Sequence, residues 1–124
     1  MLKIFVVAVG GGCGAVARYL VSVWTADRFG TAFPYGTLLA NVVGCLVIGA
    51  FMTLATERLI VSPYWRLLVT VGFIGGLTTF SSFSYETLKL LEDAQPVLAA
   101  CNILLNMGAG LLATWLGIIL ARLL

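Results

Sequence analysis

Four apolar runs, each long enough to cross a bilayer as a single helix, take up most of this chain of 124 residues. A helix needs about 20 residues to cross roughly 30 Å of hydrocarbon. Only 10% of the residues are charged and 61% are hydrophobic, whereas about a quarter of a soluble domain is charged. We therefore predict an all-α integral membrane protein that forms one domain over residues 1–124, with spans at about 2–24, 36–55, 65–91 and 97–120.

The composition excludes several classes of function. The chain has no histidine, and its net charge of +2 is small and dispersed, so neither a histidine metal site nor nucleic-acid binding is expected. Cys13, Cys45 and Cys101 fall inside apolar runs without zinc-binding spacing, and we expect them to be buried. Ser81, Ser82 and Ser84 have no histidine or lysine partner nearby in sequence, so an activated nucleophile is missing and we expect no enzyme.

The third run contains a segment that lipid would not tolerate. Residues 72–86 read GFIGGLTTFSSFSYE, with glycines and hydroxyls where a membrane helix should be most apolar. Irregular backbone at this depth survives only where protein, water or ions surround it. If the helix breaks near residues 75–79, the carbonyls of its first half would attract a cation and the N–H groups of its second half an anion. Alternatively, the hydroxyls bond back to carbonyls one turn earlier and only bend the helix.

Aromatic and hydroxyl side chains alternate just after this segment's glycines. Phe80 and Phe83 are three residues apart and share a helix face, as do Ser81 and Ser84. The edges of phenyl rings carry partial positive charge and could line an anion's route. Simple packing is the alternative for the phenylalanine pair.

Three asparagines and two charged residues are the other polar groups inside the spans. Asn41 needs a partner at a helix interface or in a pore. Asn102 and Asn106 are four residues apart and predict a polar stripe on the fourth span. Glu86 is an end residue that reaches the interface, a partner for Arg18, or a proton-coupled group.

The basic residues give almost no preference for one orientation in the membrane. With four spans, one side of the membrane carries four basic residues and the other carries three, so the usual bias that sets orientation is nearly absent. We expect insertion in both orientations, which permits an antiparallel homodimer. Glycines four apart, at 10 and 14 and at 72 and 76, favour close helix contacts, and we expect them to support association between chains. The basic residues are Lys3, Arg58, Arg66 and Arg122 on one side, and Arg18, Arg28 and Lys89 on the other.

Segments along nearly the whole chain resemble the Fluc-type fluoride channels, also called the CrcB family. They are GGGCGAVARY at 10–19, GTLLANVVGCLVIG at 36–49, GFIGGLTTFSSFSYE at 72–86 and NMGAGLLATWLG at 106–117. The resemblance implies a dual-topology antiparallel homodimer in the bacterial inner membrane, surrounded by lipid. It also implies passive export of fluoride and a structural sodium ion at the centre of the dimer.

The same resemblance assigns roles to individual residues. It implies that the backbone carbonyls of Gly75 and Thr78 hold the sodium ion, and that the pore is lined by Asn41, Phe80, Ser81, Ser82 and Phe83. Arg18 and Glu86 also fall on charged positions of the family. The fourth span departs from the pattern, because the family often has a tyrosine and serines where this chain offers Asn102 and Asn106. An amide can still donate to fluoride, so both are expected along the ion pathway with Ser84.

Two other functions remain open from the sequence. A small dual-topology multidrug transporter also has four helices, but it would use an acidic residue within its first helix, and that residue is missing here. A non-conducting accessory subunit would use the polar segment only to dock a partner. The sequence favours a fluoride-selective channel over both.

Overall fold

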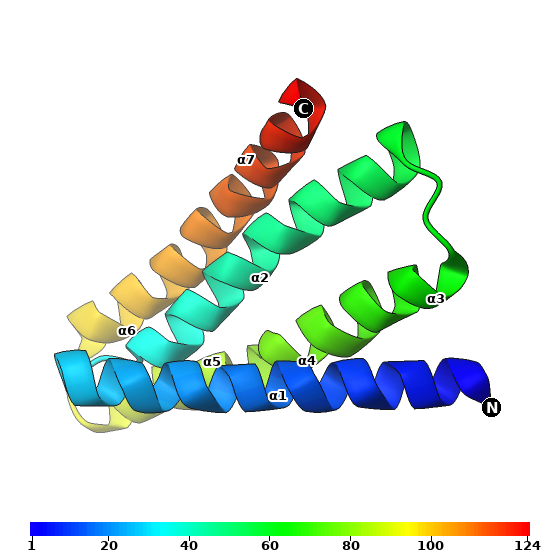
Figure 1. Cartoon of the computed structure of the whole chain (residues 1–124). Coiled ribbons are helices and arrows are strands. Elements are labelled where there is room, and N and C mark those ends of the chain that lie inside the picture. The colour runs from blue at the N-terminus through cyan, green and yellow to red at the C-terminus, as the bar shows by residue number, and fades with distance from the viewer.

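Four long helical stretches make up the computed structural model, which describes all residues from 1 to 124 (Figure 1). Each is long and apolar enough to cross a membrane, which confirms the prediction of an all-helical protein with four spans. The first helix continues to Phe29, beyond its predicted end near residue 24. The elements are α1 (Leu2–Phe29); α2 (Tyr35–Thr53) with η1 (Leu54–Arg58); α3 (Pro63–Arg66), η2 (Leu67–Ile74), α4 (Gly75–Leu77) and α5 (Phe80–Glu92); and α6 (Pro96–Leu104), η3 (Leu105–Ala109) and α7 (Gly110–Leu123). The three η elements are π-helical turns.

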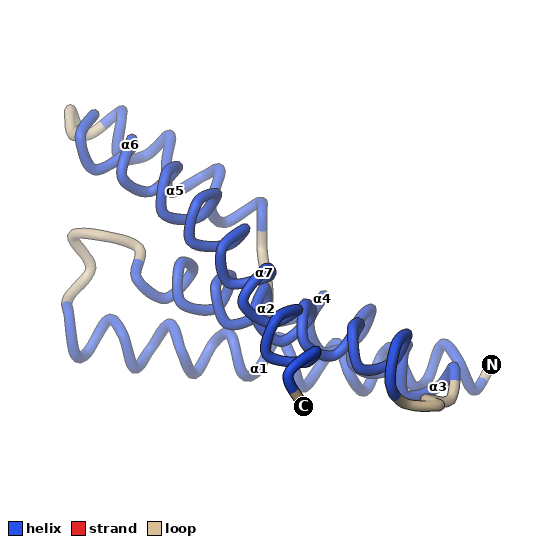
Figure 2. Tube along the Cα trace, turned by 90° about the horizontal axis from the view of Figure 1, so that it is seen from above, coloured by secondary structure: helices blue, strands red, loops and turns tan.

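Local signals in the sequence set where the helices start and stop. Gly30, with φ of 80°, ends α1 in a backbone conformation that favours glycine. Pro63 and Pro96 open the third and fourth stretches, where a missing N–H costs nothing. In Figure 2, loop 59–62 lies beside the N-terminus, loops 30–34 and 93–95 lie at the opposite end of the molecule, and the C-terminus lies nearer the middle of the view.

Close approach between helix backbones holds the chain together in two pairs. Helix α1 packs along η2 and α4, and α2 packs along α7. A Cβ atom at Gly14 would lie 2.1 Å from the carbonyl oxygen of Phe73, and one at Gly117 would lie 2.3 Å from that of Leu46. Gly10 and Gly72 also face each other. The glycines that were expected to support association between chains are therefore used within one chain.

Most side chains of the bundle point outward. Only 24 of the 124 residues are buried. Large apolar side chains therefore cover the outer surface, as expected for a protein surrounded by lipid. The prediction that the cysteines are buried was wrong: Cys13 is exposed, and Cys45 and Cys101 are half-buried. In lipid an apolar side chain gains little from being inside, so an apolar sequence run does not indicate which of its residues face the core.

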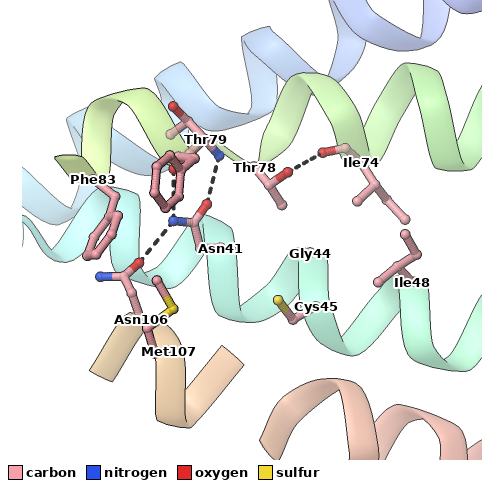
Figure 3. A pocket seen from close by; sticks show the side chains of 11 residues that line it. Asn41, Gly44, Cys45, Ile48, Ile74, Thr78, Thr79, Phe83, Asn106 and Met107 are labelled. Carbon is pink, nitrogen blue, oxygen red and sulfur yellow. Dashed lines mark hydrogen bonds between the residues drawn. The ribbon is translucent and has the colours of Figure 1, made fainter. Parts of the chain in front are cut away.

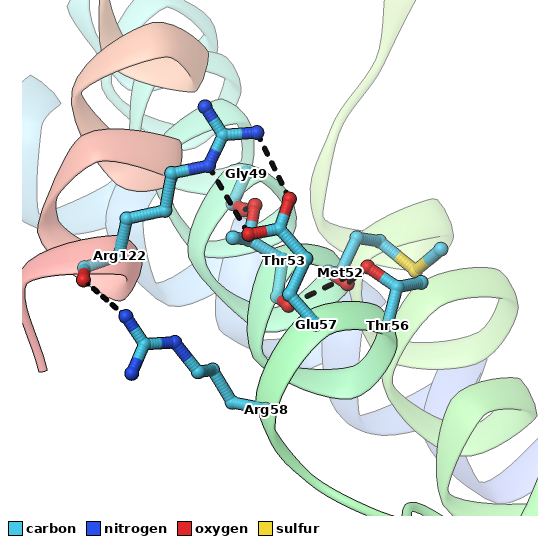
Figure 4. Close-up of polar contacts among 7 residues, drawn as sticks. All are labelled: Gly49, Met52, Thr53, Thr56, Glu57, Arg58 and Arg122. Atoms are coloured by element: carbon cyan, nitrogen blue, oxygen red, sulfur yellow. Dashed lines mark hydrogen bonds and ion pairs between the residues drawn. The ribbon is translucent and has the colours of Figure 1, made fainter.

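Arginines join the ends of the second and fourth stretches (Figure 4). The Arg122 guanidinium donates to both carboxylate oxygens of Glu57, at 2.9 and 3.2 Å. Arg58 donates to the carbonyl of Arg122, which lies in the last turn of α7. The ion pair is exposed and contributes little by itself, but together these contacts fix η1 against the end of α7.

Candidate functional site

Two residues with extended backbone interrupt the third stretch. Helix α4 ends at Leu77, Thr78 has φ −83° and ψ 154°, Thr79 has φ −152° and ψ 123°, and α5 starts at Phe80. The Thr78 N–H and hydroxyl both donate to the carbonyl of Ile74, each at 2.9 Å. The hydroxyl of Thr79 accepts from the N–H of Ser82 at 3.1 Å and so caps α5. The interruption is thus held by its own two threonines.

The side chain of Asn41 pairs with the interrupted backbone from across the bundle (Figure 3). The Thr79 N–H donates to Asn41 Oδ1 at 2.8 Å, and Asn41 Nδ2 donates to the Thr79 carbonyl at 3.1 Å. Extended backbone inside a membrane has no helical partner, and an unpaired group there is costly. The amide supplies both missing hydrogen bonds.

Gly44 lets the interruption lie directly against α2. A Cβ atom at this position would lie 2.2 Å from the methyl carbon of Thr78. No side chain fits in that space, so Gly44 and Asn41, three residues apart on one helix, fix Thr78 and Thr79 respectively.

A cavity of about 300 Å³ lies beside the interruption (Figure 3). Its walls come from the second, third and fourth stretches, and they combine amides and one threonine pair with aromatic and aliphatic groups. The lining residues are Asn41, Gly44, Cys45, Ile48, Ile74, Thr78, Thr79, Phe80, Phe83, Asn106 and Met107.

Phe80 and Phe83 lie together at this cavity but differ in exposure. Their ring centroids are 5.5 Å apart and the ring planes are inclined by 55°. Phe83 is 6% exposed and belongs to the core, whereas Phe80 is 70% exposed in the single chain. One ring is therefore fixed by packing, and the other is free to meet a partner or an ion.

The two asparagines of the fourth stretch have different positions. Asn106 lines the cavity, and its Oδ1 accepts from Asn41 Nδ2 at 2.9 Å. Asn102 is fully buried and lies outside the cavity lining. Its Nδ2 donates to the hydroxyl of Thr87 at 2.9 Å, and its Oδ1 accepts from Asn106 Nδ2 at 3.0 Å.

The remaining predicted site residues lie outside the cavity lining. Ser81 is exposed and shares a hydrogen bond with the hydroxyl of Thr79 at 3.2 Å, while Ser82 and Ser84 are half-buried. Gly75 is exposed one turn before the interruption.

Glu86 and Arg18 form no ion pair within the chain. Glu86 Oε1 accepts from the hydroxyl of Thr37 at 2.8 Å, and its Oε2 is buried without a hydrogen-bond partner. Of the three roles considered for Glu86, a partnership with Arg18 is therefore not formed inside a single chain.

Sequence reasoning missed several residues that build the site, among them Gly44, Thr79 and Thr87. Thr79 carried a usable signal, because threonine is a favoured N-cap residue and it directly precedes the first residue of α5. Gly44 and Thr87 carried none, because their importance depends on contacts with Thr78 and Asn102, which are distant in the sequence.

The fold and the polar cavity define a small multi-pass membrane protein built around an interrupted helix. Residues 5–118 match the family described as CrcB-like protein, Camphor Resistance (CrcB). The chain belongs to this family, and it is a multi-pass integral protein of the bacterial inner membrane.

Relatives match this chain over nearly their full length. The chain is 51% identical to the fluoride-specific ion channel FluC of Sulfurihydrogenibium sp. (strain YO3AOP1), over 100% of both chains. It is 47% identical to FluC of Geotalea uraniireducens (strain Rf4), over 98% of each, and 46% identical to FluC of Solibacter usitatus (strain Ellin6076), over 98% of this chain and 99% of that one.

Proposed function

We propose that this protein is a fluoride-specific ion channel that lets fluoride leave the cell passively, and that it is not an enzyme. The observation that carries the proposal is 51% identity, over the full length of both chains, to a protein named as such a channel. The cavity supports it independently, because amide donors and phenyl rings meet there without any charged side chain.

The chemistry of the cavity suits a small anion. Fluoride must replace its water with closely spaced donors, and amide N–H groups and the positive edges of phenyl rings provide them. Both N–H groups of Asn41 are engaged, one with the Thr79 carbonyl and one with Asn106 Oδ1. An incoming fluoride ion takes the place of one of these acceptors, and its higher charge density makes that exchange easier than for chloride.

The functional unit we propose is an antiparallel homodimer of chains with opposite orientations. Gly75, Phe80 and Ser81 are exposed around the interruption of a single chain. An exposed hydroxyl and exposed backbone beside a helix break are costly in contact with lipid, so a second copy covers this part of the surface near the middle of the membrane. The near-equal division of basic residues between the two sides supports opposite orientations.

A structural sodium ion fits the same place. The last carbonyls of a helix have no partner within it and carry partial negative charge, and those of Gly75 and Thr78 lie at the end of the first half of the third stretch. Gly75 is exposed, and the nearest atom to a Cβ there would be 3.8 Å away, so its surroundings are open toward a partner. Two copies would supply four such oxygens, a donor type that suits a hard cation.

Reconstitution into liposomes separates this function from its alternatives. A channel releases fluoride without a proton or cation gradient. A multidrug transporter gives proton flux driven by cationic substrates, and an accessory subunit gives no flux. The transporter is disfavoured because Asp27, the only acidic residue of α1, is exposed in the last turn of that helix. Proton flux driven by a cationic drug, with no fluoride release, would overturn the proposal.

A further inference from the structure

A line of hydrogen-bonded side chains connects α5 to the interruption. It starts at the carbonyl of Phe83, which accepts from the Thr87 hydroxyl at 2.7 Å, and continues through Asn102 and Asn106 to Asn41. We infer that Thr87 and Asn102 are positioning residues that hold the Asn106 amide with its oxygen toward Asn41. The effect on fluoride rests on the proposed function, whereas the hydrogen bonds from which the inference is argued do not depend on it.

The direction of the line follows from its start at α5. A backbone carbonyl can only accept a hydrogen bond. The Thr87 hydroxyl therefore donates its proton to the carbonyl of Phe83, and toward Asn102 it can only accept. Asn102 must then present its NH₂ group to Thr87 and its Oδ1 to Asn106. Asn106 in turn presents its NH₂ group to Asn102 and its oxygen to Asn41.

The other end of the line fixes the same direction independently. The backbone N–H of Thr79 can only donate, so Asn41 must turn Oδ1 toward it and NH₂ toward Asn106. The nitrogen and oxygen of an amide are interchangeable in shape, so only hydrogen-bond partners can assign them. Here two backbone groups of opposite polarity, at opposite ends, give one consistent assignment for all three amides.

The direction of these hydrogen bonds determines which amide groups face an ion in the cavity. Asn41 and Asn106 line the cavity, whereas Thr87 and Asn102 do not. If the line lost its fixed end at Thr87, Asn102 would have no acceptor on α5, and only the bond from Asn41 Nδ2 would keep the Asn106 oxygen in place. The Asn106 oxygen would then be held less firmly, and the hydrogen bond that it accepts from Asn41 would weaken. Thr87 and Asn102 thus act on the ion only through the two amides.

The chain offers an unusually direct test, because Asn41, Asn102 and Asn106 are its only asparagines. Selective ¹⁵N labelling of asparagine therefore gives three side-chain NH₂ signals, all from this line. Thr87→Val keeps the shape and removes the hydroxyl. We expect it to shift the Asn41 signal, although Thr87 does not contact Asn41, while Thr87→Ser leaves the signal close to wild type. An Asn41 signal that stays in place in Thr87→Val overturns the inference.

Thr114→Val is the matched control, because that hydroxyl bonds back to the carbonyl of Gly110, at 3.1 Å, and to nothing else. It should leave the Asn41 signal in place. If Thr87→Val does not yield folded protein, Asn102→Ser replaces it, since a serine is too short to bridge Thr87 and Asn106. The same displacement of the Asn41 signal is then expected, and its absence counts against the inference.

Fluoride flux provides the functional readout. Thr87→Val should raise the fluoride concentration for half-maximal flux about three- to tenfold, the size expected for one lost hydrogen bond, and Thr87→Ser should restore it. A purely structural role would reduce the number of active channels and leave that concentration unchanged, which contradicts the inference. If wild-type protein conducts no fluoride, the proposed function fails, and the Asn41 signal still decides whether Thr87 orients the amide.

Discussion

Asn41 and Thr79 exchange two hydrogen bonds although they are 38 residues apart in the sequence, with Thr79 N–H donating to Asn41 Oδ1 and Asn41 Nδ2 donating to the Thr79 carbonyl. The amide side chain takes the place of a neighbouring peptide group. A helix can be interrupted inside a membrane at modest cost when its freed backbone is paired in this way. The same amide then brings a second donor to the cavity, so the residue that stabilises the interruption is also the one that we propose contacts the ion.

The donor and acceptor roles of the Asn41 amide can be tested separately by substitution. Asn41→Asp keeps the oxygen that accepts from Thr79 and replaces the donating NH₂ with a second, negatively charged oxygen. We expect fluoride efflux from liposomes to fall at least about tenfold, because donors are lost and an anion is repelled. The variant should still purify as the native oligomer on gel filtration. Efflux at the wild-type rate would show that the donors of Asn41 are not used.

The exposed ring beside the cavity is a second target. Phe80→Ile removes the positive ring edge with little effect on folding, because the ring is 70% exposed in the single chain. Fluoride efflux should be abolished while the proposed dimer stays intact on gel filtration. Phe5→Ile is the matched control, because Phe5 is 64% exposed and lies far along α1, away from the cavity lining. Normal efflux in Phe80→Ile would remove this ring from the mechanism.

The close contact between Gly44 and Thr78 predicts a steric clash in a Gly44 variant that a second substitution, at Thr78, should relieve. Gly44→Ala places a methyl group 2.2 Å from the Thr78 methyl carbon and must displace the interruption. Overpacking of this kind costs about 1–3 kcal/mol, and we expect efflux to fall about tenfold. Adding Thr78→Ser removes the clashing methyl and should recover much of the loss relative to Thr78→Ser alone.

Gly108→Ala is the control for that pair, since a Cβ there meets no atom within 4 Å. It should conduct like wild type. If the double variant is as impaired as Gly44→Ala, contact with Thr78 is not the reason for the glycine.

The proposed sodium ion predicts a dependence on the cation. Exhaustive replacement of sodium by a large organic cation should lower fluoride flux, because the carbonyls of Gly75 and Thr78 then repel one another across the dimer. Returning sodium should restore the flux, and potassium should do so less well because it is larger. Flux that is unchanged after sodium removal at purification and assay would contradict the sodium site.

The sequence predicted the four long apolar helices, whereas the contacts that build the cavity depend on segments that are far apart in the chain. Apolar runs were sufficient for four helices, because only helices and closed barrels satisfy the backbone in lipid. The end of α1 was missed because Thr25 to Phe29 contains no strong helix breaker before Gly30. Asn102 and Asn106 share a helix face as their spacing predicted, yet only Asn106 reaches the cavity, because α5 covers Asn102 with Thr87. Such coverage depends on contacts between distant segments, which spacing along one helix does not reveal.

Selectivity for fluoride is the central claim, and bi-ionic recording from a planar bilayer tests it most directly. Purified protein is placed in a bilayer with fluoride salt on one side and chloride salt at equal concentration on the other. The account predicts a steady current whose reversal potential lies far from zero, with the sign set by fluoride as the only permeant anion. A reversal potential near zero in a bilayer that carries current would show that chloride passes as well as fluoride, and would contradict it.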